Sequence, residues 1–390
     1  MSKRNGDSRG GKQVFLDNTF ILMNKDRKIL TFQVHRSELG TLKFEEISRE
    51  SDALLPIGFS DIHSWIAHRQ APKHRAHIEK LLRLCGCYDL EGYIRVTYAL
   101  NLNDTFWIRP ASSDLIWDRV SLFRNDFDET IARLAFEGGL YGESFSTTSP
   151  EFGTSGSFAK CWIRENGKIY LMKQGSEGAR NSGLEPYSEM YASEVAAVFC
   201  RTYVPYRTEM FRGKLVSRCP LFTNERSGFV TIHAAARDIL DPEGILSYME
   251  TYGADDNFRR MVVLDALIIN TDRHRGNYGM LFDTDTLEIT GMAPVFDHNQ
   301  ALLPYAEEED FRNMDSYLAE RPTRIGEDFN EIAYGLLTPQ IRSDLQNLSG
   351  FQFSRNREYG LSEERLSVLD HLVNTQIDRI LHRKRLYIRR

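Results

Sequence analysis

Hydrophobic and polar positions alternate weakly along residues 14–50 and then change to a helical spacing. The first segment contains FILMNKDRKILTFQV and predicts a small β element, because alternate side chains of a strand point to opposite faces. Between residues 60 and 100, three short runs place apolar residues every three or four positions, which predicts three helices with tight connections. A further helix is predicted over 127–140, where a pair of glycines ends it.

Residues 146–223 follow a different pattern. A loop rich in Ser, Thr and Gly precedes two strand-like runs separated by Asn166-Gly167, and this dipeptide between two strands is a strong signal for a hairpin. The segment EPYSEMYASEVAAVFC then predicts a helix with Pro186 in its first turn. KLVSRCPLFT predicts a buried strand, and from about residue 224 the chain is predicted to be mostly helical, ending in a basic helix, TQIDRILHRKRLYIRR.

This order of elements predicts an α+β, two-lobed protein-kinase-like fold. Its parts are a small β-rich N-lobe, a mainly helical C-lobe and an extra N-terminal α/β segment. The expected divisions are a flexible tail at 1–12, an N-terminal subdomain without an assigned role at 13–130, a kinase N-lobe at 131–223 and a helical C-lobe at 224–390. A chain of 390 residues is long enough to form several such units.

Composition and charge argue against several classes of protein. The net charge of −6 does not suit a surface built as a whole for nucleic acid, and no recognition helix stands out in residues 60–100, so direct nucleic-acid binding is not favoured. No apolar run approaches the roughly 20 residues of a membrane span, and the polar N-terminal segment does not resemble a secretion signal. Five scattered cysteines predict free thiols and a cytoplasmic location.

The segment LIINTDRHRGNYG places Asp272 and Asn277 five positions apart, directly after an apolar run. Asp297 follows in APVFDHNQALL, after a predicted hairpin that turns at 283–286. Phosphoryl transfer needs a carboxylate for the acceptor hydroxyl and oxygen ligands for Mg²⁺, which kinases take from an Asp, an Asn five positions later and a second Asp. Because a hairpin brings its ends together, we expect Asp297 near Asn277. His274 either stabilises the loop or contacts a phosphate.

A second group of residues supplies the remaining parts of a kinase site. Lys173 ends the second strand of the Asn-Gly hairpin, and we expect Glu189 in the next helix to pair with it, with Glu194 as the alternative. The Gly-rich loop would let backbone N–H groups approach phosphate, and the strand near Cys219 would offer backbone to adenine. The candidate nucleotide-binding residues are Lys173, Glu189, Gly153, Thr154, Ser155, Gly156, Cys219, Leu221, Phe222 and His274.

Over residues 140–390 the chain resembles the HipA-like kinases, toxin-type Ser/Thr kinases related in fold to the phosphatidylinositol 3/4-kinases. The resemblance rests on NTDRHRGNYG and APVFDHNQAL, with support from SGSFAK and YLMK. It implies ATP and Mg²⁺ as cofactors, a protein substrate bearing Ser or Thr and an antitoxin-like partner. The absence of a membrane-binding amphipathic segment argues separately against a membrane partner. It also implies Asp272 as catalytic base, Asn277 and Asp297 as Mg²⁺ ligands, Lys173 as phosphate clamp and Phe222 beside adenine.

Two features depart from this family, and two other functions stay open. The first 130 residues do not match the family's N-terminal subdomain, and the loop offers Ser149, Thr154, Ser155 and Ser157 as autophosphorylation sites. We expect residues 146–157 to be mobile and to form a lid whose phosphorylation would repel ATP. The alternatives are a lipid or small-molecule kinase, which shares the D-R-H-x-x-N loop, and a non-enzymatic regulatory subunit bound to nucleotide or DNA.

Overall fold

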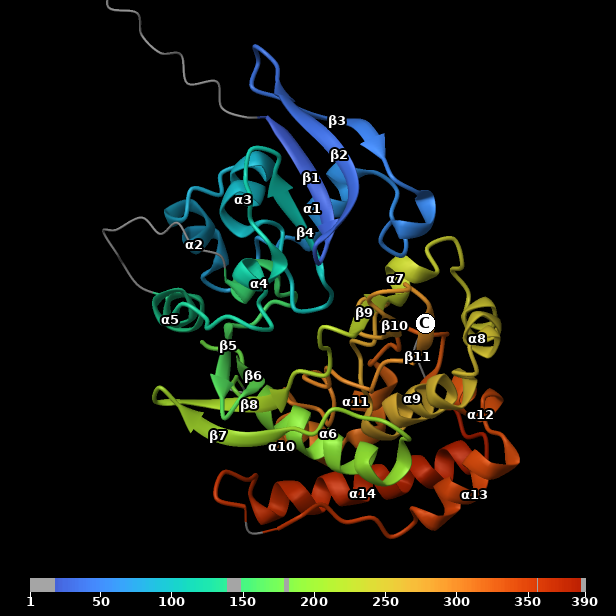
Figure 1. Ribbon diagram of the computed structural model, residues 1–390. Helices are drawn as coiled ribbons and strands as arrows, with labels where there is room; N and C mark the ends of the chain where they lie inside the picture. Colours follow the sequence, from blue (N-terminus) through green and yellow to red (C-terminus); the bar gives the residue numbers. More distant parts are fainter. Residues whose placement is uncertain (1–17, 139–148, 179–181, 356, 387–390) are drawn as a thin grey trace, which may run out of the picture.

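The computed structural model describes residues 18–138, 149–178, 182–355 and 357–386 (Figure 1). The tail predicted at 1–12 and residues 146–148 of the predicted lid lie outside these ranges. Among the described residues, no helix is both long and apolar enough to cross a membrane.

An antiparallel sheet and three helices form the N-terminal subdomain, as predicted. The strand order is β3-β2-β1-β4, and the helices cover one face, where Phe20, Phe32 and Tyr93 are buried. The elements are β1 Thr19–Asn24, β2 Arg27–Arg36, β3 Leu42–Arg49, η1 Asp52–Leu54, α1 Ile62–Arg69, α2 Ile78–Leu84, α3 Leu90–Thr97 and β4 Phe106–Pro110.

A second antiparallel sheet, of order β5-β6-β8-β7, forms the N-lobe and packs against α6. The predicted hairpin between β5 and β6 is confirmed. Asn166 (φ +50°) and Gly167 (φ +73°) both adopt the left-handed conformation that a tight two-residue turn requires. The elements are α4 Trp117–Val120, α5 Glu129–Glu137, η2 Pro150–Gly153, β5 Lys160–Glu165, β6 Lys168–Gln174, α6 Glu185–Phe199, β7 Arg207–Phe211 and β8 Lys214–Pro220.

The C-lobe is mainly helical and holds the largest hydrophobic core, centred on α9 and α14 (Figure 1). Its small sheet has the order β11-β10-β9. The elements are β9 Ser227–Thr231, α7 Ile232–Ala235, α8 Pro242–Thr251, α9 Asp255–Ile268, β10 Gly279–Asp283, β11 Ile289–Met292, α10 Glu308–Arg312, α11 Met314–Ala319, α12 Phe329–Gly335, α13 Pro339–Asn347 and α14 Glu363–Leu381. The predicted basic terminal helix is shorter than expected, because α14 ends before the basic residues that follow Leu381.

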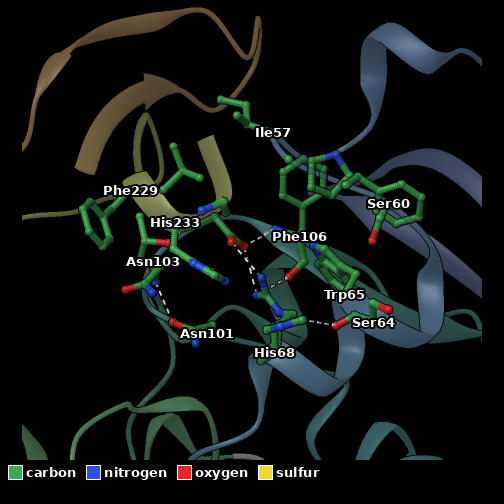
Figure 2. Close-up of a pocket in the computed structure, with 18 of the residues that line it drawn as sticks. Ile57, Ser60, Ser64, Trp65, His68, Asn101, Asn103, Phe106, Phe229 and His233 are labelled. Atoms are coloured by element: carbon green, nitrogen blue, oxygen red, sulfur yellow. Dashed lines mark hydrogen bonds and ion pairs between the residues drawn. The ribbon is translucent and has the colours of Figure 1, made fainter. Parts of the chain in front are cut away.

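The N-terminal subdomain also contacts the C-lobe. Asn24 donates to the carbonyl of Thr284 (2.7 Å), and the N–H of Phe229 donates to the carbonyl of Asn103 (2.7 Å). A cavity of about 330 Å³ lies between the two parts (Figure 2). Trp65 and His68 line it from α1, and Phe229 and His233 line it from β9 and α7. None of the residues predicted to act on nucleotide lines this cavity.

Candidate active site

Lys173 lies at the centre of a buried cluster of charges. It belongs to β6, the strand between β5 and β8, and its side chain is 8% exposed. Its Nζ lies 2.6 Å from Oε1 of Glu189 in α6 and 2.5 Å from Oδ1 of Asp297. Glu194 points elsewhere and pairs with Arg357 (2.5 Å). The structure therefore pairs Lys173 with Glu189, the preferred partner, and adds Asp297, which is 124 positions away in sequence.

The three groups stabilise one another's charges. Burial lowers the pKa of Lys173, but Asp297 and Glu189 more than offset it, so this pKa is raised. Burial raises the pKa of Asp297, but the Lys173 ammonium outweighs it and holds this pKa well below its usual value. Burial raises the pKa of Glu189. Both oxygens of Glu189 nevertheless accept hydrogen bonds, from Lys173 and from the N–H of His298 (2.9 Å), as an ionised carboxylate does.

The loop with Asp272 and Asn277 begins directly after α9. That helix is buried along most of its length and ends at Ile268, and the next residue, Ile269, has a left-handed φ of +50°. A positive φ is unfavourable for a β-branched residue and is found mainly where the surroundings enforce it. The Nδ2 of Asn277 donates to the carbonyl of Asp272 (3.0 Å), which fixes the two residues relative to each other and leaves Oδ1 of Asn277 for another partner.

Arg273 joins this loop to the segment that carries Asp297. It is buried and forms an ion pair with Asp265 of α9 (2.9 Å). Its Nη1 donates to the carbonyl of Asn277 (2.8 Å) and to that of Phe296 (2.6 Å). The sequence pattern alone does not assign a role to Arg273. The signal that was available is Asp265, a charged residue inside the apolar run MVVLDALII, which requires a buried partner.

Asp272 and His274 occupy the exposed side of the loop. The carboxylate of Asp272 is 31% exposed and lies 3.3 Å from Arg324. His274 is exposed, and its Nδ1 accepts a hydrogen bond from the N–H of Gly276 (3.0 Å). Of the two interpretations of His274, this contact corresponds to stabilisation of the loop.

Asp297 and Asn277 supply the kind of ligands that Mg²⁺ prefers. Mg²⁺ in kinases is usually held by one or two protein oxygens together with phosphate oxygens. Among the described residues, no group of three His, Cys, Asp or Glu side chains converges on one point. Asp297 and Asn277 offer a carboxylate oxygen and an amide oxygen, so an ion held by them would need phosphate oxygens of a nucleotide to complete its coordination. Asp297 itself has a φ of +60°, and its N–H donates to the hydroxyl of Tyr206 (3.2 Å).

Lys160 is a second buried lysine beside Lys173, and the sequence analysis missed it. It pairs directly with Lys173 across β5 and β6, and its Nζ donates to the carbonyl of Ser155 (2.7 Å). Burial and the neighbouring Lys173 lower its pKa well below the ordinary value. Gly156 has a φ of +90°, and a Cβ there would lie 2.3 Å from the Nζ of Lys160. Counting back from the Asn166-Gly167 turn would have identified this pairing.

The described part of the predicted lid packs against its surroundings. Ser149 is buried, and the hydroxyl of Thr154 accepts a hydrogen bond from Nε1 of Trp162 (2.8 Å). The carbonyl of Gly153 accepts one from Asn101 of the N-terminal subdomain (2.7 Å). The expectation of a loop free to swing therefore does not describe residues 149–154. Ser155 and Ser157 are exposed.

The residues predicted beside adenine have mixed placements. Leu221 donates its N–H to the carbonyl of Ile169 (2.9 Å), so this group cannot bind adenine while that bond persists. Cys219 is buried within β8, where its backbone continues the sheet. Phe222 lies against Phe229 and Phe296, with ring centroids 5.4 and 5.3 Å away. Phe222 thus reaches the residue that precedes Asp297, and the N–H of Leu221 is engaged within the N-lobe sheet.

Comparison with known proteins identifies the fold. No protein-family model and no curated protein matches the chain. The HipA of Shewanella oneidensis MR-1, solved in a complex with HipB and operator DNA, matches with a TM-score of 0.53 and 14% identity. The chain has a HipA-like kinase fold. The proinflammatory kinase CtkA of Helicobacter pylori matches with a TM-score of 0.44 and 19% identity, over 58% of this chain and 94% of CtkA.

The HipA-like fold includes most of the N-terminal subdomain. The match to the Shewanella protein covers 93% of this chain and 97% of that protein. It therefore extends well beyond residues 140–390, the range over which the sequence resemblance was found. The first 130 residues showed no match to the family's N-terminal subdomain in sequence, and the structural match extends into them because identity this low hides shared architecture.

Proposed function

We propose that this protein is an ATP- and Mg²⁺-dependent Ser/Thr protein kinase of HipA-like type. The observation that carries the proposal is the pair of contacts from Lys173 to Glu189 and to Asp297. A buried lysine shared by a helix carboxylate and an acid after the catalytic-type loop is the arrangement that protein kinases use to hold ATP. A pure structural core would gain little from three buried charges, because their desolvation is costly.

In the proposed reaction, each side chain has a separate task. Lys173 binds the α- and β-phosphates, and Glu189 holds the ammonium in place. Asp272 accepts the proton of the acceptor hydroxyl and orients its oxygen toward the γ-phosphorus. Asp297 and Asn277 would hold Mg²⁺, which neutralises charge on the phosphates when it is bound. Arg273 keeps the segments of Asn277 and Asp297 together through their backbone carbonyls.

The exposure of Asp272 favours a large acceptor. Its carboxylate is partly open to solvent and lies beside Arg324, which is 60% exposed. A hydroxyl carried on a protein surface can approach such a carboxylate without entering a deep pocket. We therefore propose a protein substrate bearing Ser or Thr. Autophosphorylation on the 149–157 segment and an antitoxin-like partner are further parts of the proposal, supported by the HipA-like fold and by the exposure of Ser155 and Ser157.

The test is phosphoryl transfer by purified protein. The protein is incubated with labelled ATP, Mg²⁺ and cell lysate, and phosphorylated species are identified by mass spectrometry. We expect labelled Ser or Thr in at least one protein, and no such label when Asp272→Asn replaces the wild type. Label found only in lipid or in small molecules would instead support the alternative kinase class. ATP binding without any transfer would support a regulatory nucleotide-binding subunit.

A further inference from the structure

Arg75 of the N-terminal subdomain lies just before α2 and is buried against the 151–160 segment. Its Nη1 donates to the carbonyls of Glu151 (2.6 Å) and Thr154 (3.2 Å), and its Nη2 donates to the carbonyl of Lys160 (2.9 Å). Burial lowers the pKa of Arg75 to about 10, so the guanidinium is still charged at neutral pH. One cation therefore binds three backbone carbonyls within ten residues.

Other groups of the same subdomain hold this segment as well. Each of these groups donates a hydrogen bond to a backbone carbonyl of the segment. These contacts therefore do not depend on which side chains the segment carries. The N–H of Ala71 donates to the carbonyl of Phe152 (2.7 Å), the N–H of Ala76 donates to that of Ser157 (3.0 Å), and Nδ2 of Asn101 donates to that of Gly153 (2.7 Å). The N-terminal subdomain thus helps to set the conformation of the segment from outside the kinase lobes.

The segment that is held contains a turn suited to phosphate. Among the described residues, none accepts a hydrogen bond from the backbone N–H groups of Ser155, Gly156 or Ser157. Consecutive free N–H groups around a residue of positive φ form a concave site for anions, and Gly156 has a φ of +90°. The Nζ of Lys160 binds the carbonyl of Ser155, which places the turn beside Lys173.

We propose that Arg75 is a positioning residue for the nucleotide phosphates, so that the N-terminal subdomain is a working part of the nucleotide site. The inference rests on the proposed function, because it assumes that ATP binds at Lys173. Arg75 contacts only backbone carbonyls of the segment, so its removal alters the shape of the phosphate turn. Adenosine carries no phosphate, so its binding should not depend on the shape of this turn.

The test compares ATP with adenosine in the full-length protein. Arg75→Lys keeps a positive charge but cannot reach three carbonyls at once. We expect the Kd for ATP·Mg²⁺ to rise about tenfold and the Kd for adenosine to stay within about twofold. The matched control is Arg69→Lys. Arg69 is also buried, but it pairs with Asp104 (2.7 Å) and donates to the carbonyls of Ala99 and Phe106, all within its own subdomain. The control should leave the ratio of the two Kd values unchanged.

A second variant covers the case in which Arg75→Lys fails to fold. Asn101→Ala removes one bond to the same segment and should raise the Kd for ATP about threefold, again without an equal change for adenosine. Unchanged ATP affinity, or equal losses for ATP and adenosine in a folded variant, would overturn the proposal. A wild type that binds ATP but transfers no phosphoryl group would refute the kinase function and leave the positioning role intact. A wild type that binds no ATP would refute both.

Discussion

Arg273 and Asp265 form a buried ion pair that fixes the loop of Asp272 and Asn277 to α9, the helix before it. The Nε and Nη2 of Arg273 lie 2.9 and 3.1 Å from the two carboxylate oxygens of Asp265. The same guanidinium then reaches the carbonyls of Asn277 and Phe296. Arg273 therefore joins α9 to the loop of Asn277 and to the segment that carries Asp297.

Asp265→Asn should destabilise the protein strongly. The substitution leaves the charge of Arg273 buried without its counter-ion, and breaking such a pair costs about 3–5 kcal/mol. Urea unfolding measures the change. The control is Arg201→Gln, which removes a solvent-exposed pair with Asp256 (2.9 Å) and should cost no more than about 1 kcal/mol. A similar loss of unfolding free energy in the two variants would contradict the role assigned to Asp265.

Lys173→Met should make stability depend on pH in a defined direction. In the wild type, the lowered pKa of Asp297 contributes stability above about pH 4, and this contribution is lost as the pH falls below that value. Without the lysine, the pKa values of buried Glu189 and Asp297 rise above their unfolded values. The folded variant then binds more protons than the unfolded chain, so its stability falls as the pH rises.

Thermal unfolding of both proteins from pH 5 to pH 8 checks this sign. We expect the wild type to have the larger free energy of unfolding. Its advantage over Lys173→Met should widen as the pH rises and should reach about 3 kcal/mol at pH 8. A difference that stays constant over this range would show that Lys173 does not neutralise the two carboxylates.

Glu189→Gln and Glu194→Gln separate the two candidate partners of Lys173 by function. Glu189→Gln should weaken ATP binding, though less than Lys173→Met, because the amide still accepts one hydrogen bond from the ammonium. Glu194→Gln removes a contact with Arg357 at the surface and should leave ATP affinity within about twofold. Isothermal titration with ATP·Mg²⁺ gives both values. A larger loss for Glu194→Gln would reverse the assignment.

The parts of the site that could be predicted are those set by local pattern. The Asn166-Gly167 turn fixed the hairpin that carries Lys173, and the spacing of Asp272 and Asn277 followed from a single loop. The buried Asp265 signals that a cation must pair with it, but the link from Arg273 to Phe296 and the contacts of Arg75 could not be predicted, because those partners are carbonyls 23 and up to 85 positions away. A backbone carbonyl has no sequence signature. The engaged N–H of Leu221 was missed for the same reason, since its acceptor belongs to β6.

Autophosphorylation, if it occurs on the 149–157 segment, should fall on the exposed hydroxyls. Ser155 and Ser157 are exposed, whereas Ser149 is buried and bonded to Glu151. We expect peptide mapping after incubation with ATP·Mg²⁺ to place the added phosphate on Ser155 or Ser157, and Asp272→Asn to show none. A phosphate on Ser149 would mean that the segment leaves the packed position seen in the structure before it reacts.

The most direct measurement of the central claim is the rate of phosphoryl transfer by Asp272→Asn and Asp297→Asn beside the wild type. Each substitution keeps the size of the side chain and removes the charge needed for proton acceptance or for holding Mg²⁺. Circular dichroism and unfolding midpoints establish that each variant is folded. We predict that both rates fall below about a tenth of the wild-type rate, since each role contributes several kcal/mol to lowering the barrier. A folded variant of either kind that retains more than this would contradict the mechanism.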